Sequence, residues 1–85
     1  MNPLDIDPNN LAQKVNRLTP RQLEIIGLLA QGHSNKQVGY ILSIGVTTVK
    51  RHIYNACNRV EVENKTQLIV IYVIWKASTE LTNIE

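Results

Sequence analysis

Three helix-start signals recur along this chain, and they constrain its fold more than any other feature. Thr19-Pro20-Arg21-Gln22 sets a hydroxyl before a proline and a glutamine three residues later, which is the pattern of a capping box. Ser34-Asn35-Lys36-Gln37 repeats the box, and Asn64-Lys65-Thr66-Gln67 is similar to it. Side-chain oxygens at such positions accept hydrogen bonds from the first turn of a helix. The signals therefore predict helices that begin near residues 20, 35 and 65.

Apolar residues at helical spacing extend the first two starts into two short helices, and a third helix follows these two. The first should run over about 20–31, with Gly32 as its stop, and the second should end near Leu42. Gly45 can then act as the N-cap of a third helix over 46–60. Two short helices joined by about three residues are the ingredients of a helix-turn-helix, although any small helical bundle can contain such a pair.

The segment 46–60 has two chemically different faces. At about 100° per residue, its apolar residues form one stripe that should face a core: Val46, Val49, Ile53, Ala56, Cys57 and Val60. The opposite face carries Thr47, Arg51, Tyr54, Asn55 and Asn58, flanked by Lys50 and Thr48. The segment contains no carboxylate, whereas a solvated helix usually mixes Glu with Lys. This face therefore favours an anionic partner that displays donors and acceptors, as the floor of a DNA groove does.

The run Leu68–Trp75 is apolar on every side. Its β-branched and aromatic residues would suit a buried strand, but the chain offers no partner strand and the Asn64 cap indicates a helix. A helix that is apolar all round must be covered on more than one side, and we expect a domain of 85 residues to cover only one. The second side is therefore predicted to meet another protein chain.

Charge and composition narrow the classes of protein. The net charge is only +2, but residues 14–65 hold eight basic and three acidic side chains, between acidic ends. A single cysteine excludes an internal disulfide and any multi-cysteine metal site. The N-terminus lacks a secretory signal, and the longest apolar run is far shorter than the roughly 20 residues that span a bilayer. We expect a cytoplasmic protein without a membrane association or cofactor.

An enzyme is not expected. Cys57 lies on the apolar stripe of its helix, and His33 and His52 have no identifiable partner set for acid–base or nucleophilic chemistry. We therefore assign no catalytic and no metal-binding residues.

The N-terminal residues 1–17 are predicted to form an arm. Asp7-Pro8 can cap a short helix, and Leu11, Val15 and Leu18 recur at helical spacing, so part of the arm should pack on the body. The helical body is expected over 18–79 and a C-terminal tail over 80–85.

A series of short motifs spans about residues 18–75: Leu18-Thr19-Pro20-Arg21, Glu24, Leu28-Leu29-Ala30, Gly32, Ser34-Asn35-Lys36, Ile44, Thr48-Val49-Lys50, His52, Val62, and Asn64 with Thr66-Gln67. In this order they resemble the LuxR-type (GerE-type) helix-turn-helix domain of bacterial transcription regulators. The resemblance implies an all-α domain of four helices, here with a short N-terminal arm. Its third helix would enter the DNA major groove, and its fourth would form a dimer contact.

Carried over residue by residue, the resemblance implies two sets of DNA contacts. The base-reading residues would be Lys50, Arg51 and Tyr54. The phosphate-binding residues would be Asn35, Lys36, Thr47, Thr48 and Asn55. Hydrogen-bond chemistry agrees, because Arg and Lys can donate to guanine O6 and N7, and a helix N-terminus offers free N–H groups to a phosphate.

Several residues depart from the family pattern. Gly45 stands where a serine usually caps the third helix. Glu61 replaces a common glycine after that helix, so the conformation of the turn there is not predicted. Leu68 and Tyr72 replace small residues that usually face the core. If these two face inward, Val70, Ile71 and Ile74 face outward, and we assign those three to the dimer interface.

The leading hypothesis is a homodimer that binds double-stranded DNA and regulates transcription, with RNA polymerase or another regulator as a further partner. The alternative is an interaction protein that heterodimerises with a larger LuxR-type regulator through its fourth helix. Only some seventeen residues precede the helical body, which favours a stand-alone regulator over a fragment.

Overall fold

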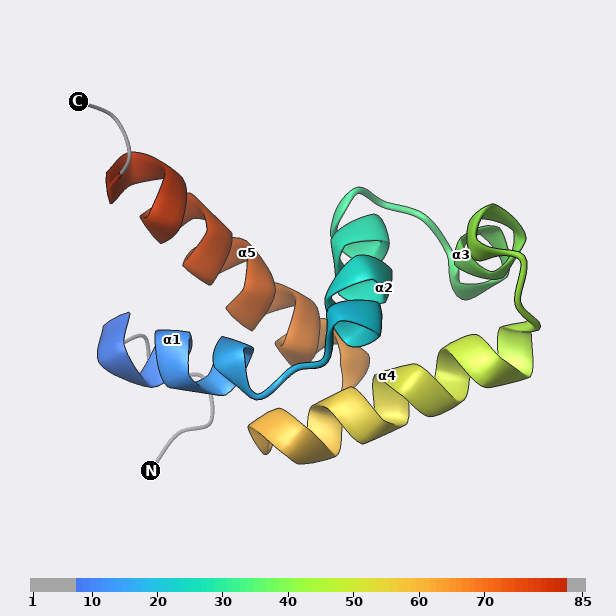
Figure 1. Ribbon diagram of the computed structural model, residues 1–85, viewed down its shortest axis with the longest axis horizontal. Helices are drawn as coiled ribbons and strands as arrows, with labels where there is room; N and C mark the ends of the chain where they lie inside the picture. Colours follow the sequence, from blue (N-terminus) through green and yellow to red (C-terminus); the bar gives the residue numbers. More distant parts are fainter. Residues whose placement is uncertain (1–7, 83–85) are drawn as a thin grey trace.

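Five helices make up the part of the chain that the structure describes, residues 8–82 of a computed structural model (Figure 1). In chain order they are α1 (Pro8–Asn16), α2 (Pro20–Ala30), α3 (Asn35–Leu42), α4 (Val46–Val60) and α5 (Lys65–Thr82). The all-α prediction is confirmed. The expected count of four helices is wrong by one, because the arm contributes α1.

The predicted starts and stops agree with the observed helices within a few residues, except at the end of α5. The body was expected to end at residue 79, whereas α5 continues to Thr82. The short helix expected in the arm is α1. The proposed cap at Asp7 lies outside the described residues.

Capping explains where α2, α3 and α5 begin. The Gln22 amide N–H donates to the Thr19 hydroxyl at 3.1 Å, and the Gln22 side-chain oxygen accepts from the Thr19 amide at 3.0 Å. Ser34 and Gln37 exchange the same two bonds at 3.1 and 2.9 Å. Asn64 accepts from the Gln67 amide at 2.9 Å. Each side chain satisfies an N–H group that the helix leaves without an internal partner.

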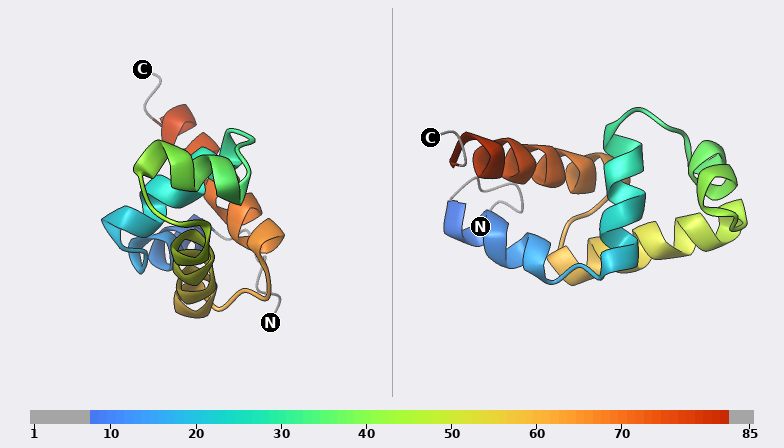
Figure 2. Two further views of the ribbon diagram at one scale, coloured as in Figure 1. Left: turned by 90° about the vertical axis from the view of Figure 1, so that its right-hand side faces the viewer. Right: turned by 45° about the horizontal axis from the view of Figure 1, so that its top comes forward.

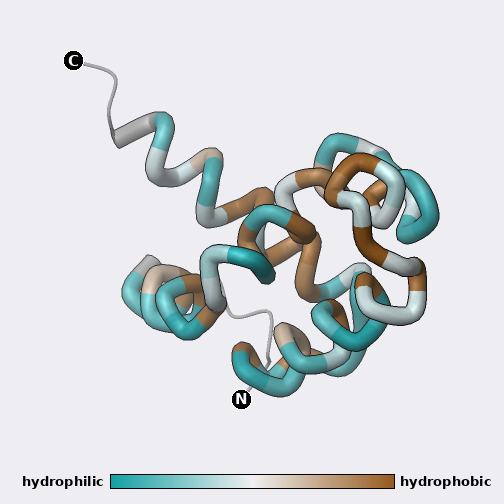
Figure 3. Tube along the Cα trace, turned by 45° about the vertical axis from the view of Figure 1, so that its right-hand side comes forward, coloured by the Kyte–Doolittle hydropathy of each residue, from teal (hydrophilic) through white to brown (hydrophobic). Residues whose placement is uncertain are grey.

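Helix α2 lies at the centre of the molecule. Figures 1 and 2 show α3 on one side of α2 and the pair α1 and α5 on the other, while α4 runs past its base. The core is continuous through all five helices and consists of Leu11, Val15, Leu18, Ile25, Ile26, Leu29, Val38, Val49, Ile53, Ala56, Cys57, Val60, Val62, Leu68 and Ile71. In Figure 3 the hydrophobic stretch of α5 lies in the half nearer the body and its far end is more hydrophilic, and the α5 residues of this core, Leu68 and Ile71, lie in that nearer half.

The arm is an integral layer of the fold. Helix α1 packs against both α5 and α4, and its side chains Leu11 and Val15 are each only 2% exposed. The expectation that part of the arm would pack on the body through Leu11, Val15 and Leu18 is confirmed, since all three are buried.

One prediction for α5 is wrong. Ile71 was expected to face outward, but it is 2% exposed and belongs to the core, together with Leu68. Ile71 follows Leu68 by three residues, so the two side chains lie on the same face of the helix. Val70 and Val73 remain exposed, at 37% and 46%.

Tyr72 packs beside Gly27 of α2. A Cβ at Gly27 would lie 3.3 Å from the Tyr72 hydroxyl oxygen, so the far end of the Tyr72 side chain lies close to the glycine. None of the helices within residues 8–82 has the length and apolarity to cross a membrane.

Candidate nucleic-acid interface

The turn between α3 and α4 holds the two helices of the expected helix-turn-helix at a fixed angle. Ser43 ends α3 in the left-handed conformation, with φ 59° and ψ 42°. The Ile44 amide donates to the Gly39 carbonyl at 2.9 Å, which folds the connection back over α3. Gly39 must be a glycine for this approach, because a Cβ there would lie 2.7 Å from the Ile44 carbonyl oxygen.

Helix α4 has the two faces that the sequence indicates. Its apolar stripe is buried from Val49 to Val60, although Val46 at the start of the stripe is 40% exposed. The opposite face is open to solvent along Thr47, Arg51, Tyr54 and Asn58, which are spaced four, three and four residues apart. Such spacing places the four side chains on one line along the helix.

The three residues assigned to base reading all project from α4 into solvent. Lys50 and Arg51 are exposed, and Tyr54 is 67% exposed. Neither Lys50 nor Arg51 forms an ion pair with any carboxylate among residues 8–82. The two ion pairs found there engage Glu24 and Glu61 with arginines of α2 and of the segment after α1. Lys50 and Arg51 are therefore available to an anionic ligand.

The residues assigned to phosphate binding come from two helices. On α4, Thr47 and Asn55 are exposed and Thr48 is half-buried. At the start of α3, Lys36 is exposed and Asn35 is half-buried. All five side chains are thus at least partly open to solvent.

Sequence reasoning missed one basic residue in this region. The Lys65 ammonium donates to the Asn35 side-chain oxygen at 3.2 Å, so the first residue of α5 lies beside the first residue of α3. Lys65 and Lys36 therefore flank Asn35 with two cations. The 30 residues that separate Lys65 from Asn35 along the chain explain why the sequence did not indicate this contact.

Gly45 at the cap of α4 and Cys57 within the helix both have structural roles. Gly45 takes the N-cap position without a side-chain hydrogen bond, as expected of a glycine. Cys57 is 7% exposed on the apolar stripe, and burial raises the pKa of its thiol. A raised pKa keeps the thiol protonated near neutral pH, which is the state of a packing residue rather than a nucleophile.

The exposed part of α5 forms a narrow apolar strip. Val70, Val73 and Ala77 are exposed at a spacing of three and four residues, and Ile74 lies at the edge of this strip and is half-buried. Of the three residues assigned to the dimer interface, Val70 thus faces outward, Ile74 does so in part and Ile71 does not. Val73 and Ala77 take the place of Ile71 on the open face.

Comparison with known proteins decides the family. A model of the bacterial regulatory proteins of the luxR family matches residues 16–72, from the last residue of α1 into α5. The chain belongs to this family. The LuxR-type resemblance drawn from its motifs is therefore confirmed.

Longer regulators share this LuxR-type segment. The transcriptional regulatory protein LiaR of Bacillus subtilis is 45% identical over 53 residues, which cover 62% of this chain and 25% of LiaR. The response regulator protein VraR of Staphylococcus aureus is 36% identical over 59 residues, which cover 69% of this chain and 28% of VraR. The chain thus matches between a quarter and a third of the length of these relatives. No solved structure matches it.

Proposed function

We propose that this chain is a sequence-specific DNA-binding regulator of transcription, whose α4 enters the major groove. The observation that carries the proposal is the solvent face of α4, where Thr47, Arg51, Tyr54 and Asn58 form a line without a carboxylate while the opposite face is buried. A helix of this kind fits the major groove, which presents a distinct pattern of donors and acceptors for each base pair.

Base reading is assigned to three residues of α4. Arg51 can donate two hydrogen bonds to guanine O6 and N7, and Lys50 can reach the same acceptors from the flank of the line. Tyr54, 67% exposed, can donate through its hydroxyl or contact a thymine methyl group.

Phosphate binding is assigned to the edges of the same surface. Thr47, Thr48 and Asn55 on α4 can hold one stretch of backbone. Asn35 and Lys36 at the start of α3 can hold another, and Lys65 adds a cation beside Asn35. Contacts of this kind fix the register of the helix on the duplex, whereas the base contacts select the sequence.

The strip of Val70, Val73 and Ala77 is proposed as a homodimer contact. A two-fold axis beside α5 would present two copies of α4 to DNA, so the preferred site should be a palindrome with half-sites about one helical turn apart. The same strip also fits a longer LuxR-type regulator. That alternative is favoured by the observation that the matched relatives are three to four times the length of the matched segment.

The decisive experiment is selection of bound sequences from a random duplex pool, with light scattering on the same sample. A palindromic motif recovered by a dimer supports the homodimer. A folded monomer that recovers no motif, and that binds a full-length LuxR-type relative, supports the interaction protein instead.

Two variants then separate the assigned roles. Arg51→Ala should weaken binding to the selected site by about 1 to 3 kcal/mol and relax the preference at one base position. Lys36→Ala should weaken binding to all duplexes alike and reduce the salt dependence by about one released counterion. A uniform loss for Arg51→Ala would show that Arg51 contacts phosphate and does not read a base.

A further inference from the structure

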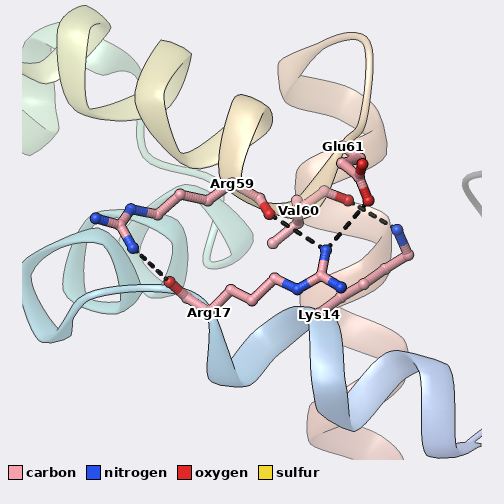
Figure 4. Close-up of polar contacts among 5 residues, drawn as sticks. All are labelled: Lys14, Arg17, Arg59, Val60 and Glu61. Carbon is pink, nitrogen blue, oxygen red and sulfur yellow. Dashed lines mark hydrogen bonds and ion pairs between the residues drawn. The ribbon is translucent and has the colours of Figure 1, made fainter.

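Helix α1 is joined to the C-terminal end of α4 by a set of polar contacts (Figure 4). The Lys14 ammonium donates to the Val60 carbonyl at 2.8 Å. The Arg17 guanidinium donates to the Arg59 carbonyl at 3.5 Å and to the Glu61 carboxylate at 3.2 Å. The Arg59 guanidinium in turn donates to the Arg17 carbonyl at 3.2 Å. The two chain segments thus exchange hydrogen bonds in both directions, although more than 40 residues separate them.

These contacts meet a need of α4 itself. Arg59 and Val60 are the last two residues of the helix, and a helix supplies no internal donor to the carbonyls of its last turn. Those carbonyls also form the negative end of the helix dipole, where cations are stabilising. Lys14, Arg17 and Arg59 bring three cationic side chains to this end, where the carboxylate of the C-cap residue Glu61 pairs with Arg17.

The contacts are held in place by the core. Leu11 and Val15 fix α1 against α5 and α4, and Lys14 lies between them in the sequence, one turn after Leu11. Lys14 is partly buried in its bond to Val60, so its ammonium group is already committed within the protein. Leu11 and Val15 therefore hold α1 against the core, and Lys14 reaches the C-terminal end of α4.

Helix α4 is consequently attached at both ends. Its N-terminal end follows the tight turn that Gly39 permits, and its C-terminal end is bound by Lys14 and Arg17. At 1.5 Å per residue α4 is roughly 22 Å long, and the proposed base-reading residues 50–54 lie between the two attachments. The inclination of these residues toward a DNA groove thus depends on where each end is held.

We propose that Lys14 and Arg17 are positioning residues for DNA recognition: they fix the C-terminal end of α4 and act through that helix instead of contacting DNA. The inference rests on the proposed function. This role for Lys14 does not follow from the family match. That match begins at residue 16 and leaves out Lys14 and nearly all of α1.

The test compares Lys14→Met and Arg17→Met with a matched control, Arg21→Met. Arg17 and Arg21 each form an exposed ion pair with a glutamate, at 3.2 and 3.1 Å, but the pair of Arg21 lies within α2 and does not involve α4. Met preserves an unbranched apolar stem while it removes the charge. Two quantities are measured: amide hydrogen exchange in residues 58–62 of the free protein, and affinity for the selected and a random duplex over a range of salt concentrations.

A positioning role predicts faster exchange in residues 58–62 for the two test variants, with unchanged exchange in α2 and an unchanged helical spectrum. Affinity for the selected duplex should fall by roughly five- to tenfold, the lower range of coupling between distant sites. Affinity for random DNA and the salt dependence should stay as in the wild type. Lys14→Arg should retain most of the affinity, and Arg21→Met should behave as the wild type.

Other outcomes overturn the inference. A salt dependence reduced by about one counterion would show that Lys14 or Arg17 binds phosphate directly. Unchanged exchange and unchanged affinity in both variants would show that the end of α4 does not need these bonds. If Lys14→Met lowers the folded fraction, Arg17→Met, whose side chain is 46% exposed, decides the matter. A wild-type chain that selects no sequence would refute the proposed function as well, whereas selective wild-type binding with unaffected variants refutes this inference alone.

Discussion

Replacement of Gly39 by alanine tests whether the α3–α4 turn sets the position of α4, the proposed recognition helix. An added Cβ would lie 2.7 Å from the Ile44 carbonyl oxygen, which is 0.7 Å short of the 3.4 Å at which ordinary contact begins. The group that must yield is backbone, and the Ile44 amide is already tied to the Gly39 carbonyl at 2.9 Å. The turn can therefore accommodate the methyl group only by shifting the start of α4.

Two opposing effects determine the size of the change. Alanine is favoured over glycine inside a helix by about 1 kcal/mol. Overpacking at a buried site typically costs about 1 to 3 kcal/mol, and loss of the Ile44–Gly39 hydrogen bond costs about 1 kcal/mol more. The net expectation for Gly39→Ala is a loss of about 1 to 3 kcal/mol in the free energy of unfolding, or roughly 4 to 24 °C in Tm for a domain of this size.

Gly27→Ala is the matched control, because Gly27 also lies inside a helix. The nearest atom to its added Cβ is the Tyr72 hydroxyl oxygen at 3.3 Å, at the far end of a side chain that can move. This variant should be unchanged or more stable by up to about 1 kcal/mol. Urea unfolding followed by circular dichroism measures both variants, and binding to the selected duplex should weaken for Gly39→Ala alone. If Gly39→Ala proves as stable as Gly27→Ala and binds DNA normally, the close approach at the turn does not constrain α4.

The remaining predictions concern the ends of α4 and the surface of α5. Gly45→Ser should stabilise the fold by a few tenths of a kcal/mol, because its extended backbone and open surroundings suit a capping hydroxyl, whereas Gly45→Ala should bring no such gain in thermal unfolding. Ser43→Gly should stabilise by about 1 kcal/mol, because Ser43 has a positive φ of 59°. Glu61→Gly relieves a similar φ of 61° but loses the exposed ion pair with Arg17, so urea unfolding should show a smaller gain; an equal gain would mean that the pair contributes nothing. Ile71→Glu should abolish folding by placing a charge in the core, while Val73→Glu should leave a folded chain whose light scattering shows a monomer; a Val73→Glu dimer would place the contact elsewhere.

Local signals account for most of what the sequence predicts about the fold. The boxes at Thr19 and Ser34 set the starts of α2 and α3 through bonds that span three residues, so their outcome depends little on the rest of the chain. The two faces of α4 follow from its periodicity for the same reason. The family match gives independent support to the order of these motifs.

Long-range packing accounts for what the sequence does not predict. The contact between Lys65 and Asn35 arises only when the fold brings the side chain at the start of α5 within reach of the start of α3. The error at Ile71 is different, because its spacing of three residues from Leu68 already places both side chains on one face of α5. The turn at Glu61 keeps the left-handed conformation without a glycine, and the Arg17 partner of that carboxylate was not apparent from the sequence.

The contact between α1 and α5 has a consequence for biosynthesis. Helix α1 is made before α5, and the core residue Ile71 of α5 follows some 55 positions after the last residue of α1. At about 5 to 20 residues per second, the ribosome needs roughly 3 to 11 s to deliver them. During this interval the apolar side of α1 is not covered by α5. The C-terminal end of α4 then lacks its contacts with a stably packed α1. A nascent chain should therefore complete the packing around α4 only after α5 has been made, when α1 and α5 can pack against each other.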